Sequence, residues 1–105
     1  MNVNNNVILS VIIPTKNRPH LLKRALTSVV TQNFNGFELC IVDNNADIVT
    51  SNLVKQTVNE FEKQYPHITW IYIHSAKKFA SGARNDGMAA TTGNLIFFLD
   101  DDDEF

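Results

Sequence analysis

The chain alternates apolar stretches of strand length with segments whose apolar residues recur at helical spacing. The strand-like stretches are residues 7–13, 37–42, 68–74 and 95–99. The first is β-branched and almost continuously apolar, a pattern typical of a strand buried on both faces of a parallel sheet. Pro14 is expected to end this strand.

Three helices are predicted between these strands, each with one apolar or small-residue face. Pro19 suits the first turn of the first helix, Pro66 closes the second and Gly93 stops the third. The small residues of the third helix allow it to approach the sheet closely. The inner faces are formed by Leu21, Leu22, Ala25, Leu26, Val29 and Val30 in the first helix, by Val54, Val58, Phe61 and Tyr65 in the second, and by Ala80, Ala83, Gly87 and Ala90 in the third.

Strand and helix alternate four times without repeats, so right-handed crossovers predict an α/β fold with a Rossmann-like, doubly wound parallel sheet of four strands and three helices. Parallel strands end at the same edge of a sheet. Polar residues that follow the first, second and fourth strands should therefore gather there: Thr15, Asp43 and the acidic run of residues 100–103. Ligands of open α/β sheets bind at this edge.

The fourth strand leads directly into consecutive carboxylates, Asp100 to Glu104. Like charges at this spacing repel one another unless a cation or hydrogen-bond donors lie among them. Asp100 and Asp102 point the same way if strand geometry continues, and their hard oxygen ligands favour Mg²⁺ or Mn²⁺ over Zn²⁺. A metal-bound phosphate or diphosphate site is the working hypothesis. The alternative is that these residues only solvate a strand end or begin a disordered acidic tail.

Other candidate residues each have two interpretations. The ionised carboxylate of Asp43 suits the imide N–H of uracil or thymine, but an aspartate after a strand also serves as a cap or turn residue. Thr15 could touch the base or ribose, or bond to its own chain. Arg84 could bind an anion or pair with the acidic run. Glycine-rich dinucleotide and Walker motifs are missing from the sequence, which disfavours those cofactor classes.

Composition narrows the class of protein. With 105 residues, 44% of them hydrophobic, the chain is one domain at most. A net charge of -2 without a basic stripe argues against nucleic acid as a partner. The single cysteine, Cys40, is expected to be a buried, inert thiol. A signal peptide and a membrane span are not recognised, so a soluble, cytoplasmic protein is expected.

Four motifs together resemble those of family 2 glycosyltransferases, in the correct order and over nearly the whole chain. They are residues 10–18, residues 38–44, residues 82–87 with Gly93, and residues 98–103. The resemblance implies a GT-A fold, of which residues 1–105 are the N-terminal, nucleotide-sugar-binding part, truncated at the DxD motif. It implies nucleotide binding by Pro14, Thr15, Asn17, Asp43, Arg84, Asp100 and Asp101, and metal binding by Asp102 and Asp100. Lys16 replaces an aromatic residue often found there, which leaves stacking on the base open.

The resemblance also implies an activity. A metal-dependent and inverting transfer of a sugar is expected, from a nucleotide-diphosphate sugar such as a UDP-sugar to a glycan or lipid-linked acceptor, in polysaccharide biosynthesis. The acceptor site and catalytic base are expected beyond residue 105, so this piece should bind donor but be inactive alone. The full-length protein could associate peripherally with a membrane. The alternatives are a non-catalytic nucleotide-binding module and a phosphatase of the haloacid dehalogenase type, although that type places its Asp-x-Asp pair after the first strand.

Overall fold

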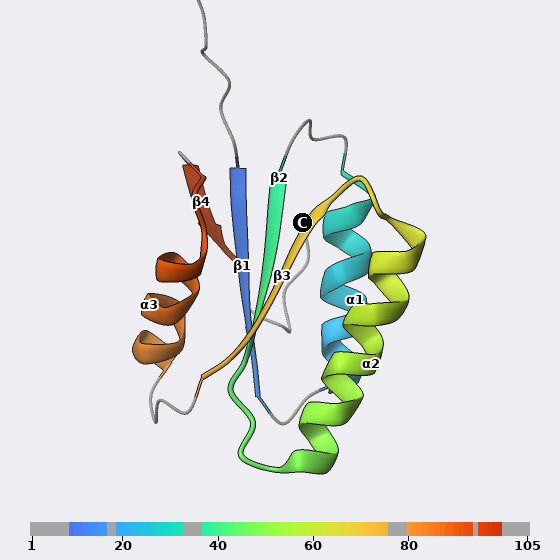
Figure 1. Cartoon of the computed structure of the whole chain (residues 1–105), viewed down its shortest axis with the longest axis vertical. Coiled ribbons are helices and arrows are strands. Elements are labelled where there is room, and N and C mark those ends of the chain that lie inside the picture. The colour runs from blue at the N-terminus through green and yellow to red at the C-terminus, as the bar shows by residue number, and fades with distance from the viewer. Residues whose placement is uncertain (1–8, 17–18, 33–36, 76–79, 94, 100–105) are drawn as a thin grey trace, which may run out of the picture.

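The computed structural model describes residues 9–16, 19–32, 37–75, 80–93 and 95–99, and Figure 1 shows their arrangement. Every predicted strand and helix is present in the predicted order. The bounds are β1 (Leu9–Thr15), α1 (Pro19–Val30), β2 (Phe37–Asp43), α2 (Ile48–Gln64), β3 (Thr69–His74), α3 (Ala80–Ala90) and β4 (Leu95–Phe98).

The four strands form one parallel sheet in the order β3-β2-β1-β4. Helices α1 and α2 cover one face of this sheet and α3 covers the other (Figure 1). The predicted Rossmann-like, doubly wound α/β fold is therefore confirmed. The strand order reverses at β1, because β2 and β3 lie on one side of it and β4 lies on the other. Ligands of such sheets bind where the order reverses, at the carboxyl ends of the strands.

The larger core lies between the sheet and helices α1 and α2. Alternate residues of a strand point to opposite faces, so Val11 and Ile13 of β1 enter this core while Ile12 points away from it. Most of the predicted inner faces of α1 and α2 are buried here, but Leu21 is only partly buried and lies outside this core, and Tyr65 is partly buried against it. The members of the core are Val11, Ile13, Leu22, Ala25, Leu26, Val29, Val30, Phe37, Leu39, Ile41, Val54, Val58, Phe61, Ile68 and Leu99.

A smaller core joins the other face of the sheet to α3. It contains Ile12, Cys40, Val42 and Ala83, and Gly87 of α3 lies directly over it. A Cβ atom added to Gly87 would lie 2.6 Å from Cγ2 of Ile12, which is closer than van der Waals contact permits. The small residues of α3 thus allow the close approach that the sequence predicts.

Pro14 does not end β1, contrary to the expectation from sequence. The strand continues to Thr15 and stays paired with β2, whereas its pairing with β4 runs only from Leu9 to Ile12. Successive residues of a strand direct their backbone groups to opposite neighbours, so the missing N–H of Pro14 falls on the β4 side, past the end of that pairing. The proline is therefore compatible with the β1–β2 pairing.

Helix α2 has clear signals at both ends. The carboxylate of Asp47 accepts hydrogen bonds from the backbone N–H groups of Val49 and Thr50, at 3.4 and 3.2 Å, and these bonds lower its pKa together with one from the Thr50 hydroxyl. At the other end the backbone N–H of Tyr65 donates to the carbonyl of Phe61 at 2.8 Å.

Across the described ranges, the helices are too short or too polar to traverse a bilayer.

Candidate functional site

Hydrogen bonds join the carboxyl ends of the first three strands. The backbone N–H of Asn44 donates to the carbonyl of Thr15 at 2.9 Å, which ties the end of β2 to β1. The backbone N–H of Ser75 donates to the carbonyl of Asp43 at 2.9 Å, which ties β3 to β2. The side-chain amide of Asn44 also donates to the carbonyl of Ser75, at 2.8 Å. The three strand ends therefore form one connected edge, here called the carboxyl edge.

Asp43 is the most deeply placed polar group of the carboxyl edge, with 0% of its surface exposed. Its Oδ1 accepts hydrogen bonds from the backbone N–H of Asn45 at 3.1 Å and from the Asn45 side chain at 2.7 Å. Its Oδ2 accepts a hydrogen bond from the hydroxyl of Tyr72. The turn role that the sequence left open for Asp43 is thus present. Its contact with a base remains a prediction.

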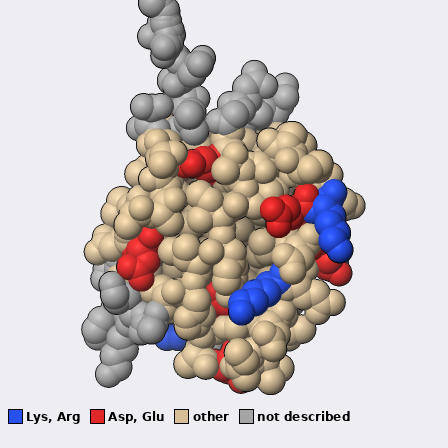
Figure 2. Space-filling view, viewed as in Figure 1, with Lys and Arg blue, Asp and Glu red and all other residues tan. Residues whose placement is uncertain are grey.

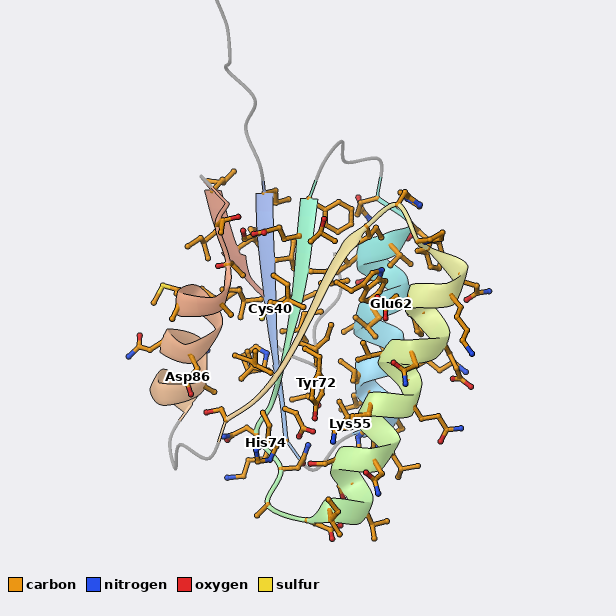
Figure 3. The ribbon with its side chains drawn as sticks, in the orientation of Figure 1. Cys40, Lys55, Glu62, Tyr72, His74 and Asp86 are labelled. Carbon is orange, nitrogen blue, oxygen red and sulfur yellow. The ribbon has the colours of Figure 1, made fainter. Side chains whose placement is uncertain are left out.

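Tyr72 reaches Asp43 from β3 and lies between the sheet and α2, beside Lys55 (Figure 3). Nζ of Lys55 lies 5.9 Å from the centre of the Tyr72 ring. Burial, together with the hydrogen bond to Asp43 and the negative charge of that residue, raises the pKa of Tyr72, so the hydroxyl keeps its proton and acts as a donor. One ring nitrogen of His74 lies 2.8 Å from the carbonyl oxygen of Asn45.

The end of β4 lies beside β1. The backbone N–H of Leu99 donates to the carbonyl of Ile12 at 3.0 Å, and Asp100 is the next residue in the sequence. The guanidinium of Arg84 in α3 lies 5.8 Å from the centre of the Phe98 ring. Phe98 stands two residues before Asp100 in the sequence. Both predicted roles of Arg84 remain predictions.

Several predicted site residues fall outside the described residues: Asn17, Asp100, Asp101 and Asp102. Pro14 and Thr15 lie at the end of β1, where Thr15 is buried and Pro14 is partly exposed. Within the described ranges, His, Cys, Asp and Glu side chains form no group of three or more that could hold a metal ion. The metal site at Asp100 and Asp102 remains a prediction.

Two surface grooves lie outside the carboxyl edge. The larger, of about 600 Å³, runs along the exposed side of α1 and is lined by residues of that helix and its end, from His20 to Gln32. The other, of about 240 Å³, lies between α2 and β3 and includes Lys55 and Tyr72. Acidic and basic side chains are interspersed on the α2 side of the face in Figure 2. One helix alone does not enclose a ligand, which argues against the groove along α1. The carboxyl edge is the stronger candidate site because ligands of open α/β sheets bind beyond the carboxyl ends of the strands.

The sequence that forms this site matches a known protein family. The model of the family described as glycosyl transferase family 2 matches residues 10–105. The chain belongs to glycosyltransferase family 2. Members of this family are enzymes. The match includes the whole carboxyl edge and the acidic run.

Relatives of this glycosyltransferase chain include two bacterial enzymes. One is the GalNAc(5)-diNAcBac-PP-undecaprenol beta-1,3-glucosyltransferase of Campylobacter jejuni, which is 35% identical over 91% of this chain and 30% of its own length. Another is the UDP-Glc:alpha-D-GlcNAc-diphosphoundecaprenol beta-1,3-glucosyltransferase of Escherichia coli, 31% identical over 91% of this chain and 35% of its own. The chain therefore spans about a third of the length of these relatives.

A solved mannosyltransferase from Pyrobaculum calidifontis, in complex with GDP-Man and Mn²⁺, has a similar fold. It superposes with a TM-score of 0.79 at 20% sequence identity, over 92% of this chain and 28% of its own. This likeness agrees with the GT-A, Rossmann-like architecture that the motifs implied.

Sequence reasoning missed a buried carboxylate at the opposite end of the glycosyltransferase sheet. Glu38 of β2 accepts hydrogen bonds from the hydroxyl of Ser10 at 2.7 Å and from the backbone N–H and hydroxyl of Thr92, both at 2.9 Å. Burial alone would raise the pKa of Glu38, but these hydrogen bonds outweigh it and lower the pKa. The network fixes the connection from α3 to β4. The sequence did contain one signal for this buried carboxylate, which is a charged residue, Glu38, inside the apolar run 37–42.

Proposed function

We propose that the protein transfers a sugar from a nucleotide-diphosphate sugar, a UDP-sugar, to the hydroxyl of a glycan or lipid-linked glycan. The observation that carries the proposal is the connected carboxyl edge at the point where the strand order reverses. Beside this edge β4 ends at Phe98, two residues before Asp100. Membership of the family supports the reaction class, and the Escherichia coli relative is named for UDP-Glc.

The proposed site divides into a base side and a phosphate side. Pro14, Thr15, Asn17 and Asp43 form the base side at the ends of β1 and β2. Arg84 and the acidic run form the phosphate side, which contains Asp100, Asp101 and Asp102. Carboxylate oxygens following β4 fit Mg²⁺ or Mn²⁺ by their chemistry, with Asp102 and Asp100 as the ligands. The Mn²⁺ in the Pyrobaculum mannosyltransferase complex is compatible with this choice.

The chemistry requires stabilisation of a leaving diphosphate. When bound, the divalent ion supplies a positive charge that neutralises the leaving group. The residues of this chain bind and orient the nucleotide part of the donor, and Arg84 adds a second positive charge near the acidic run. The catalytic base and the acceptor site are not assigned to residues 1–105, which form the donor-binding part. An inverting outcome follows from the resemblance to the family.

Calorimetric titration of UDP and GDP, each with and without Mn²⁺, tests the proposal. The expected result is UDP binding that strengthens by about tenfold or more when Mn²⁺ is present, because Asp100 and Asp102 would hold the ion and its positive charge would attract the diphosphate. Uridine, which has the same base without the phosphates, is the matched control and should show no dependence on Mn²⁺. Binding of UDP that is equally strong with and without the metal would contradict the metal-dependent site.

A further inference from the structure

We propose that Glu38, Ser10 and Thr92 are positioning residues for the proposed metal site. Their hydrogen bonds fix the register of β4 against β1, and the register decides which aspartates of the acidic run are placed to bind the divalent ion. These residues lie at the opposite end of the sheet from the carboxyl edge and act on the ion only through β4. The inference rests on the proposed function, in which Asp102 and Asp100 hold the ion.

The composition of the acidic run makes the register of β4 decisive. Four aspartates follow one another at positions 100–103. A shift of β4 by one residue would therefore exchange the places of Asp100 and Asp102 with those of Asp101 and Asp103. Such a shift also turns every side chain of a strand to the other face of the sheet. Because all four side chains are the same, the run cannot select its own register, which must be set by other residues.

Strand β4 itself specifies its register weakly. It has 4 residues, each paired with one residue of β1 from Leu9 to Ile12. The side chains of β4 are between 37% and 56% exposed, so neither face of the strand is buried deeply enough to favour one register strongly. Leu99 is buried and bonded to the carbonyl of Ile12, which holds the end of β4 nearest the acidic run. The other end needs an anchor of its own.

The hydrogen bonds of Glu38 and Ser10 supply this second anchor just before β4 begins. The two residues are register partners in β2 and β1, and the Ser10 hydroxyl donates to Oε1 of Glu38 at 2.7 Å. The backbone N–H of Thr92 donates to Oε1 and its hydroxyl donates to Oε2, both at 2.9 Å. The backbone N–H of Gly93 donates to Oγ of Ser10 at 2.9 Å. Two successive residues before β4 are thus bonded to both central strands.

A short connection transmits this anchor to β4. A single residue, at position 94, stands between Gly93 and Leu95, the first residue of β4. A shift of one residue corresponds to about 3.3 Å along a parallel strand, and a connection of one residue has little slack to absorb it. The shift would therefore break the bonds to Ser10 and Glu38. Both side chains are buried, so the loss of their partners is costly.

The test replaces Glu38 by methionine, which is similar in length and removes both acceptor oxygens. The gain in UDP affinity on adding Mn²⁺, expected to be about tenfold or more in the parent, should fall below about threefold. Binding of uridine should change by less than about twofold, because uridine engages only the base side. Without ligand, NMR should show faster hydrogen exchange at the backbone N–H of Leu99 and weaker backbone contacts between Val11 and Phe97, which are register partners.

Two control variants separate positioning from stability. Glu38→Gln keeps an oxygen in the place of Oε1, which accepts from the Ser10 hydroxyl and from the backbone N–H of Thr92. This variant should therefore retain the Mn²⁺ dependence of UDP binding, although the loss of charge lowers the stability of the domain. Glu60→Met removes an exposed carboxylate of α2 and should behave as the parent does in every measurement.

Each other outcome has a distinct meaning. If the parent shows the Mn²⁺ dependence and Glu38→Met keeps it, the positioning role is wrong while the proposed function stands. Equal losses of uridine and UDP binding in a folded variant would also overturn it, since the effect would not be confined to the metal. If UDP binding by the parent does not depend on Mn²⁺, the proposed metal site fails and the positioning role fails with it. Should Glu38→Met not fold, Ser10→Ala removes the hydroxyl that joins Glu38 to Gly93 and must show the same selective loss.

Discussion

The backbone N–H of Leu99 donates to the carbonyl oxygen of Ile12 across 3.0 Å, which keeps β4 aligned with β1 up to the residue before the acidic run. Ile12 is fully buried, and its side chain packs against α3 in the smaller core. Leu99, the last described residue before the acidic run, is therefore fixed to the core of the domain. Three further features of that core give measurable predictions.

Glu38→Gln should destabilise the domain in a pH-dependent way. The pKa of Glu38 is lowered in the folded state from its ordinary value of 4.5, so its ionised form adds stability above that value and the contribution is lost as the pH falls through the folded pKa. At neutral pH we expect a loss of about 1–2 kcal/mol in the free energy of unfolding, because the hydrogen bonds from Ser10 and Thr92 lose a charged acceptor. Urea unfolding at a series of pH values measures this.

The difference in the free energy of unfolding between Glu38→Gln and the parent protein should shrink as the pH falls below 4.5 and through the lowered pKa of the folded state. Glu60→Gln, an exposed glutamate of α2, serves as the control and should change the free energy of unfolding by less than about 0.5 kcal/mol. If the free energy of unfolding of Glu38→Gln differed from that of the parent by the same amount at every pH, the charge of Glu38 would have no part in the stabilisation.

Gly87→Ala should destabilise the domain although alanine is the better helix former. The added methyl group would lie 2.6 Å from Cγ2 of Ile12 and 3.1 Å from Cγ2 of Val42, so α3 must move away from the sheet. Overpacking of this kind costs about 1–3 kcal/mol, which exceeds the helix-propensity gain of about 1 kcal/mol. Thermal unfolding tests it, with the exposed Met88→Ala as the control. A variant more stable than the parent would mean that α3 lies less close to β1.

The fold was predictable because each element carries its own signal. Most of the periodic apolar residues of α1 and α2 belong to the larger core, and the small residues of α3 match its close approach to Ile12. The end of β1 was not predictable in the same way. Pro14 stays paired with β2, and a local reading of proline does not tell which neighbouring strand its missing N–H would face.

Cys40 should be unreactive in the folded protein. Burial, with a smaller effect from the charge of Glu38, raises the pKa of the Cys40 thiol to about 12, so almost none of the reactive thiolate is present at about pH 8. We expect labelling by iodoacetamide to proceed only as fast as the protein unfolds. The same protein in guanidinium chloride is the control and should be labelled rapidly. Fast labelling of the folded protein would place Cys40 at an accessible position.

The candidate site was only partly predictable from the sequence. Residues after successive strands were expected to gather at one edge, and the ends of β1, β2 and β3 are indeed joined by hydrogen bonds. The contact between Tyr72 and Asp43 was not foreseen, because the two residues are 29 positions apart and their approach depends on the pairing of β2 with β3. Glu38 and Thr92 meet across 54 positions for a similar reason.

The measurement that tests the central claim most directly is the binding of UDP to Asp102→Asn, with and without Mn²⁺. The account holds that Asp102 binds the divalent ion through which the diphosphate is bound. The parent protein should then bind UDP about tenfold or more tightly with Mn²⁺ than without it, and the variant should show no such gain. Glu60→Gln, which removes an exposed carboxylate from α2, should behave as the parent does. An Asp102→Asn protein that binds UDP in Mn²⁺ as tightly as the parent would contradict the account.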